Sequence, residues 1–136
     1  MTDQELVTLA FEARAMSYSP YSKFKVGAAL LAKDGTVYKG CNIESASYSP
    51  TNCAERTAFF KAVSDGITDF EAIAVVGGFE ADETPLCYPC GVCRQVMAEF
   101  CTSDFRIIMG DSKGNTHVAT LDEILPHRFG PADLMA

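Results

Sequence analysis

The sequence predicts an α/β fold, with a three-layer α/β/α arrangement around a mixed five-stranded sheet. Two observations lead to this prediction. Helix-like and strand-like apolar patterns alternate along the chain, which favours parallel strands joined by right-handed crossovers. The Asp34-Gly35 pair lies between two strand-like runs and is typical of a hairpin, so antiparallel strands are expected as well.

The first half of the chain is expected to contain two helices and a hairpin. Thr2 and Glu5 have the spacing of a capping box, which marks the start of a helix. Apolar side chains alternate from Phe24 to Leu30, as in a strand with one buried face. The expected elements are a helix at about residues 3–16, strands at 24–30 and 37–41, a loop at 42–51 and a helix at 53–63.

The second half is expected to alternate buried strands with helices. Residues 77–89 carry two glycines, two prolines and several acids, so we predict a loop there, with a solvated acidic run at Glu80-Ala81-Asp82-Glu83. Thr120 and Glu123 repeat the capping-box spacing. The other expected elements are strands at 70–76, 105–109 and 116–119, a helix at about 92–100, a turn at 111–115 and a short last helix that Pro126 ends.

Size and charge limit the classes of function. A chain of 136 residues suits a single domain spanning residues 1–136. Its net charge of −7 and its 11 scattered Lys and Arg residues argue against a nucleic-acid or membrane partner and favour a small, uncharged substrate. No apolar run reaches the roughly 18 residues that span a bilayer, and the acidic N-terminus differs from a secretion signal. We therefore expect a cytoplasmic protein.

Clustered cysteines indicate a metal site. In a reducing compartment such clusters bind metal or do chemistry more often than they form disulfides. Cys90 and Cys93 lie three residues apart, so at the start of a helix they face the same side. Cys53, at the start of another expected helix, would complete the three protein ligands of a catalytic zinc, whose fourth position holds water. Helix N-termini also stabilise thiolates.

Two residues beside Cys53 suit catalysis at such a metal. Glu55 could take a proton from a zinc-bound water and later deliver it to a leaving group. Three thiolates leave the zinc site with a net negative charge, and Arg56 could offset it.

The spacing of the cysteines leaves alternatives open. Cys87 and Cys90 form a second Cys-x-x-Cys, although Pro89 and the following helix favour Cys90 with Cys93. A structural zinc is the other interpretation, and it would leave Glu55 unexplained. Its fourth ligand could come from Cys87, His117 or His127. Cys41 and Cys101 are expected to be small core residues.

The two cysteine motifs resemble the signature of the zinc nucleoside and base deaminases, in which Cys or His, one residue and Glu are followed by Pro-Cys-x-x-Cys. The chain looks like the small homotetrameric cytidine deaminases, and the resemblance covers nearly its whole length. It is carried by the metal motifs, by Phe24-Lys25-Val26-Gly27-Ala28-Ala29-Leu30, by Gly40-Cys41-Asn42-Ile43-Glu44 and by Leu125-Pro126. It implies one Zn²⁺ per subunit and a homo-oligomer, a tetramer with shared active sites.

The same resemblance implies roles for residues outside the metal motifs. Asn42 and Glu44 match a pair that holds the ribose hydroxyls, Phe24 matches a ring packed against the pyrimidine, and the backbone of Ala54 matches a contact to the base edge. Tyr48 and Phe129 match residues that complete the pocket of a neighbouring subunit, and Arg56 matches a residue that donates hydrogen bonds to the zinc thiolates.

The resemblance therefore implies hydrolytic deamination of cytidine and deoxycytidine in pyrimidine salvage. A zinc-bound hydroxide would attack C4 of the cytosine ring, and protonation of the amine by Glu55 would release ammonia. A nucleotide or polynucleotide substrate is a second hypothesis, against which Glu44 and the acidic charge argue. Other aminopyrimidine nucleosides, including antibiotic-type ones, are a third, although Asn42-Ile43-Glu44 favours an ordinary ribose site. A zinc-stabilised binding module without turnover is a fourth.

Overall fold

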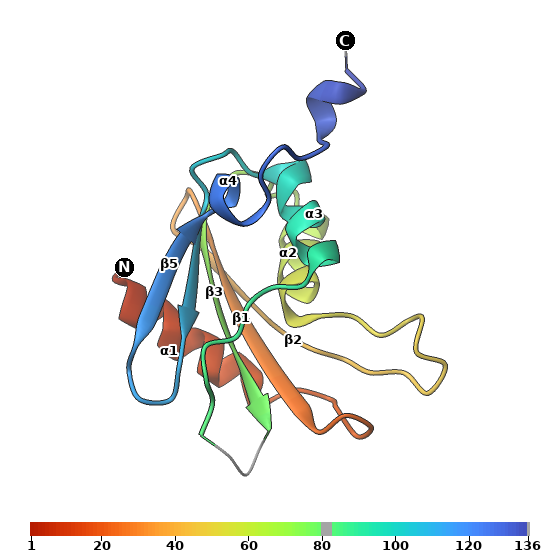
Figure 1. Ribbon diagram of the computed structural model, residues 1–136, viewed down its shortest axis with the longest axis vertical. Coiled ribbons are helices and arrows are strands. Elements are labelled where there is room, and N and C mark those ends of the chain that lie inside the picture. Colours follow the sequence, from red (N-terminus) through yellow and green to blue (C-terminus); the bar gives the residue numbers. More distant parts are fainter. Residues whose placement is uncertain (80–82, 136) are drawn as a thin grey trace.

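The computed structural model describes residues 1–79 and 83–135, which fold into one mixed sheet flanked by helices (Figure 1). No helix among these residues is long and apolar enough to cross a bilayer. The elements are α1 (Asp3–Arg14), β1 (Phe24–Ala32), β2 (Val37–Cys41), α2 (Ala54–Ser64), β3 (Phe70–Phe79), α3 (Gly91–Phe100), β4 (Arg106–Gly110), β5 (Thr116–Thr120), α4 (Leu121–Ile124) and a 3₁₀ helix (Pro131–Asp133).

The five strands lie in the order β2-β1-β3-β4-β5. The hairpins β1–β2 and β4–β5 are antiparallel, as expected, and β3 pairs antiparallel with β1 but parallel with β4. The chain leaves β2, passes through α2 and enters the sheet again at β3, on the far side of β1. The predicted mixed α/β sheet is confirmed.

Helices cover both faces of this sheet (Figure 1). On one face α1 buries Leu6, Val7 and Ala10 against one side of β1, β3 and β4. On the other face α2 and α3 bury Ala58, Phe59 and Met97 against the alternate residues of the same strands. Burial on both faces explains why these strands carry nearly continuous apolar runs. The start of α2 and the start of α3 consequently lie on the same face of the sheet.

The predicted loop at 77–89 is wrong at its beginning, because β3 continues to Phe79. Gly77, Gly78 and Phe79 pair with the first three residues of β1, and the Arg14 guanidinium donates hydrogen bonds to the carbonyls of Gly78 and Phe79. These long-range partners override the turn preference of the two glycines. The acidic run predicted to be a solvated loop lies, at positions 80–82, outside the described residues.

The helix ends follow the sequence closely. Thr2 caps α1 by accepting a hydrogen bond from the Glu5 amide, although α1 ends at Arg14, two residues before the predicted end. The capping box of Thr120 and Glu123 is present at α4. The 3₁₀ helix near the C-terminus was not expected from the sequence.

Two glycines set how closely the helices approach the sheet. A Cβ atom built on Gly27 would lie 2.0 Å from the Ala10 carbonyl oxygen of α1, and one on Gly40 would lie 2.5 Å from the Ala54 oxygen of α2. Both neighbours are backbone atoms of packed helices and cannot move aside cheaply. Gly40 therefore allows the first turn of α2 to rest directly on β2.

We predict that Gly27→Ala destabilises the protein by at least about 2 kcal/mol, because the added methyl group must push α1 away from the sheet. Gly91→Ala is the matched control, since a Cβ there meets nothing within 4 Å. Its effect should stay within about 1 kcal/mol. Urea denaturation of both variants measures the difference, and equal midpoints would contradict the close packing of α1.

Candidate functional site

Three thiols meet where two helices begin. Cys53 is the N-cap of α2, Cys90 is the N-cap of α3, and Cys93 lies in the first turn of α3. Neither N-cap side chain bonds its own helix, so both sulfurs are free to face one another. The three Sγ atoms all lie within 4.8 Å of one another, and those of Cys53 and Cys90 are 3.8 Å apart.

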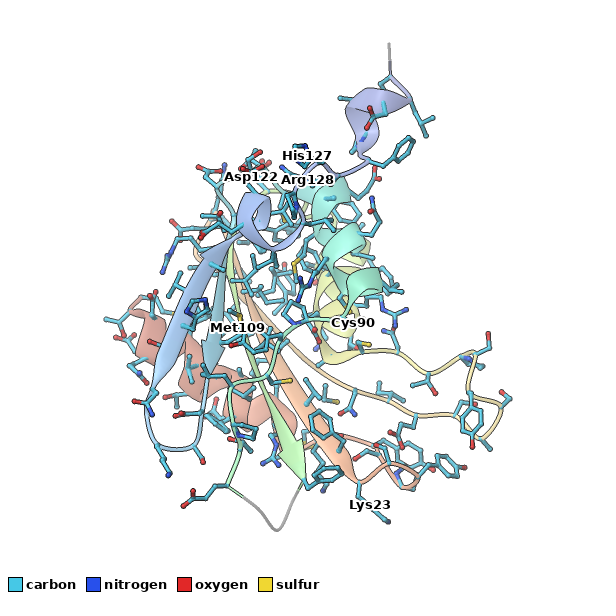
Figure 2. All side chains as sticks on the ribbon, in the orientation of Figure 1. Lys23, Cys90, Met109, Asp122, His127 and Arg128 are labelled. Carbon is cyan, nitrogen blue, oxygen red and sulfur yellow. The ribbon has the colours of Figure 1, made fainter. Side chains whose placement is uncertain are left out.

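This arrangement fits a zinc ion. A tetrahedral zinc with Zn–S bonds of about 2.3 Å places its sulfurs about 3.8 Å apart. Within the described part of the chain, no other Cys, His, Asp or Glu joins the group. Figure 2 shows Cys90 at the start of α3 and His127 beside Asp122 and Arg128, away from Cys90. The group therefore has the three protein ligands of an open site rather than the four of a closed structural site.

Cys87, the competing ligand from the sequence, lies apart from the three thiols. It packs against Gly77 of β3, where a Cβ on that glycine would come within 2.8 Å of the Cys87 sulfur. Burial raises the pKa of the Cys87 thiol to about 11, and its sulfur is not part of the group of three thiols that lie within 4.8 Å of one another. His117 is exposed on β5. Among the alternatives left open by spacing, the structure favours Cys90 with Cys93.

Arg56 lies against the thiols and donates a hydrogen bond to one of them. Its Nη2 donates a hydrogen bond to Cys53 Sγ at 3.3 Å, while its Nε is buried and has no partner among the described residues. Hydrogen bonds from the Cys93 thiol and from Arg56 lower the pKa of Cys53 to about 5. Because zinc with three thiolates has a net charge of −1, a guanidinium at this position reduces the cost of gathering them.

Glu55 is a buried carboxyl beside these thiols. It lies in the first turn of α2, with only 4% of its surface exposed. Burial raises its pKa to about 7, and the neighbouring Cys53 thiolate adds to the rise. A carboxyl with this pKa can both accept and release a proton near neutral pH, as general acid–base catalysis requires.

A cavity of about 320 Å³ opens in front of the thiols and is large enough for a small ligand. It collects side chains from β1, the loop after β2, the start of α2 and the segment before α3. Of the residues singled out from the sequence, its walls contain Phe24, Asn42, Glu44, Cys53, Ala54, Glu55 and Cys90. Cys93 is fully buried behind them.

Asn42 and Glu44 are held rigidly in this wall. The Asn42 amide donates to the Phe24 carbonyl at 2.7 Å and accepts from the Val26 amide at 3.0 Å. The Glu44 carboxylate accepts hydrogen bonds from the backbone amides of Tyr21 and Ser22. These bonds fix the polar end of the cavity before any ligand arrives.

Sequence reasoning missed several wall residues. Besides Cys87, which was expected only as a loop thiol near the site, the cavity is lined by Ser22, Val26, Thr51, Asn52 and Tyr88. None of them was given a role from the sequence, and the tertiary structure is what brings them to one wall. The one available signal was proximity, because each lies within a few residues of a singled-out position.

Tyr48 and Phe129 do not line this cavity. Tyr48 is 77% exposed and faces a second cavity of about 450 Å³ that shares Ser22, Glu44 and Thr51 with the first. Phe129 is 58% exposed on the C-terminal segment, where Gln95 donates a hydrogen bond to its carbonyl. Neither ring lines the cavity in front of the thiols of its own chain.

Comparison with known proteins connects this geometry to a family. Residues 1–109 match the family model for the "Cytidine and deoxycytidylate deaminase zinc-binding region". A cytidine deaminase of Sporosarcina psychrophila is 52% identical over 98% of this chain and 96% of its own length. The crystal structure of a cytidine deaminase from Burkholderia pseudomallei superposes with a TM-score of 0.87, at 44% identity, over 95% of this chain and 100% of that one.

The chain belongs to the cytidine and deoxycytidylate deaminase family. The resemblance inferred from the two cysteine motifs is thereby confirmed. The matched region is described as zinc-binding and contains all three clustered thiols, so zinc is the cofactor. The chain is also similar to an enzyme with another name, a blasticidin-S deaminase of Bacillus cereus, which is 33% identical over 93% of this chain and 91% of its own length.

We predict that Cys90→Ser abolishes zinc binding, whereas Cys87→Ser retains about one zinc per chain. Cys90 belongs to the thiol cluster and Cys87 does not. Atomic absorption on the dialysed proteins measures the zinc content, with circular dichroism to confirm folding. Loss of zinc from folded Cys87→Ser, with zinc retained in Cys90→Ser, would reverse the assignment.

Proposed function

We propose that this protein is a zinc-dependent cytidine deaminase that hydrolyses cytidine and deoxycytidine to uridine and deoxyuridine, with release of ammonia. One observation carries the proposal. A buried carboxyl, Glu55, lies beside a three-thiol zinc centre and faces a cavity of nucleoside size. Relatives named cytidine deaminase at 52% identity support the same substrate class.

The residues divide the work of the reaction. Bound zinc supplies a Lewis acid that lowers the pKa of water. Glu55 takes a proton from the attacking water and delivers it to the departing amine, which its raised pKa of about 7 suits. Arg56 compensates the charge of the thiolates through its hydrogen bond to Cys53. The backbone of Ala54, at the N-terminus of α2, is placed to contact the polar edge of the base.

The remaining wall residues recognise the nucleoside. Phe24 provides an aromatic surface for the pyrimidine, and Asn42 and Glu44 hold the sugar hydroxyls. Hydrogen bonds to Ser22 and neighbouring amides lower the pKa of Glu44, so the group is an anion at neutral pH. An anion beside the sugar favours a neutral nucleoside and opposes a phosphorylated one.

We further propose a homotetramer in which Tyr48 and Phe129 complete the active site of a neighbouring copy. Both rings are exposed in the single chain and are therefore accessible to a neighbouring copy, which supports this idea. Pyrimidine salvage in the cytoplasm is the proposed setting. All six cysteines are free, which suits a reducing compartment.

We predict that the wild-type protein deaminates cytidine and that Glu55→Ala and Glu55→Gln lower kcat by about a thousandfold while keeping zinc. Ultraviolet absorbance and released ammonia measure turnover. Activity of Glu55→Gln near that of wild type would remove the proton-transfer role. A zinc-loaded, folded wild-type protein that leaves cytidine unchanged would point instead to another amine-bearing nucleoside or to a structural zinc.

We predict that kcat/KM for cytidine exceeds that for CMP by about tenfold or more, because the Glu44 carboxylate repels a phosphate on the sugar. Parallel assays at equal ionic strength measure the ratio. Faster turnover of CMP than of cytidine would contradict a nucleoside site.

We predict that Glu55→Ala and Phe129→Ala chains complement each other. A mixed oligomer contains sites with an intact Glu55 from one chain and an intact Phe129 from the other. Dissociating, mixing and reassociating the two variants should therefore raise activity above the sum of the separate preparations. Light scattering checks assembly, and no recovery in mixed oligomers would place Phe129 outside the neighbour's site.

A further inference from the structure

We propose that Ser22 is a positioning residue that links the Glu44 carboxylate to the backbone of Phe24, so that the sugar contact and the base platform form one rigid unit. No motif marks Ser22 in the sequence. The inference rests on the proposed function for the meaning of the two residues it connects. The link itself rests on the hydrogen bonds that Ser22 makes with Glu44 and Phe24.

Ser22 contacts both residues directly. Its hydroxyl donates to Glu44 Oε2 and accepts a hydrogen bond from the Phe24 amide at 3.0 Å. Its backbone amide donates to Glu44 Oε1 at 3.1 Å, next to the bond from the Tyr21 amide at 3.0 Å. One serine thus holds both oxygens of the carboxylate and the first residue of β1.

These bonds leave Glu44 with little freedom. An ionised carboxylate only accepts hydrogen bonds and has about four acceptor positions. Two amides occupy Oε1 and the Ser22 hydroxyl occupies one position of Oε2, which leaves one acceptor on Oε2 for a ligand hydroxyl. The carboxylate is therefore oriented before a sugar binds, and Ser22 supplies two of the three bonds that orient it.

Both backbone polar groups of Phe24, its amide and its carbonyl, are hydrogen-bonded to side chains. Ser22 accepts from its amide, and the Asn42 side chain donates to its carbonyl. Its ring packs edge-on against Phe79 of β3, with ring centroids 5.2 Å apart. The two residues proposed to hold the sugar, Asn42 directly and Glu44 through Ser22, thereby also fix the residue proposed to meet the base.

The backbone between Ser22 and Phe24 needs such an anchor. Lys23 has φ of +62°, in the left-handed region that residues other than glycine rarely adopt. Figure 2 shows Lys23 where the preceding loop joins the start of β1. Such strain persists where surrounding contacts enforce it. Apart from the Lys23 amide bond to the Ser19 carbonyl, the bonds of Ser22 are the nearest ones that hold this turn.

The expected consequence is a loss of substrate binding rather than of chemistry. Glu44 and Phe24 are proposed to contact parts of the nucleoside away from the reacting amine, so loss of the bonds by which Ser22 positions them should raise KM and leave kcat nearly unchanged. Loss of a hydrogen bond to a charged group is expected to weaken substrate binding by about tenfold or more. Ser22 is exposed, so its replacement should hardly change stability.

The test compares Ser22→Ala with Ser22→Thr, which keeps the hydroxyl. We expect Ser22→Ala to raise KM for cytidine about tenfold with kcat within about twofold, and Ser22→Thr to restore most of the affinity. Ser64→Ala is the control, because that hydroxyl donates to a backbone carbonyl in α2, outside the cavity. An unchanged KM in Ser22→Ala, or a Ser22→Thr variant as weak as Ser22→Ala, would overturn the proposal.

A double-mutant cycle with Glu44→Gln tests whether Ser22 acts through Glu44. If Ser22 acts through Glu44, Ser22→Ala should raise KM very little in a protein that already carries Glu44→Gln. Additive effects of the two substitutions on KM would overturn the link. Binding of uridine, measured by calorimetry, gives the same comparison without turnover. Wild type that binds uridine but leaves cytidine unchanged would refute the proposed function, while about tenfold weaker uridine binding by Ser22→Ala would still support this inference.

Discussion

The meeting of three thiols at the starts of two helices is the constraint on which the site depends. It requires α2 and α3 to begin side by side on one face of the sheet. The order β2-β1-β3-β4-β5 achieves this, because the connections through α2 and α3 both run over the same face. Gly40 lets the first turn of α2 rest against β2, which brings Cys53 within 3.8 Å of Cys90. The fold thus delivers a metal site from residues 37 positions apart.

The negative charge of three thiolates accounts for the charged groups that surround them. Three thiolates exceed the charge of one zinc ion, and the excess is met by Arg56 and by the partial positive charge of two helix N-termini. The same burial and negative charge raise the pKa of Glu55 to about 7. The arrangement that binds the metal therefore also raises the pKa of Glu55, the proposed proton carrier.

The sequence could predict the parts of the site that depend on local spacing. Cys90 and Cys93 face one side because they are three residues apart in a helix, and Glu55 follows from its place beside Cys53. The extension of β3 through Gly77, Gly78 and Phe79 depended on pairing with β1, which local sequence does not show. The sequence favoured Cys93 over Cys87 through Pro89 and the following helix, and the structure adds that Cys87 packs against Gly77 of β3. The role of Ser22 could not be predicted from the sequence, because its partners, Glu44 and Phe24, come together only in the folded chain. Tyr48 and Phe129 stay predictions, since their proposed partners belong to another copy.

Zinc X-ray absorption spectroscopy on the purified protein tests the central claim most directly. An open site formed by Cys53, Cys90 and Cys93 predicts three sulfur neighbours at about 2.3 Å and one oxygen or nitrogen neighbour at about 2.0 Å. Adding a nucleoside ligand should leave the three sulfurs in place and perturb only the light-atom shell. Four sulfur neighbours would mean that Cys87 or another thiol closes the site as a structural zinc, and would contradict this account.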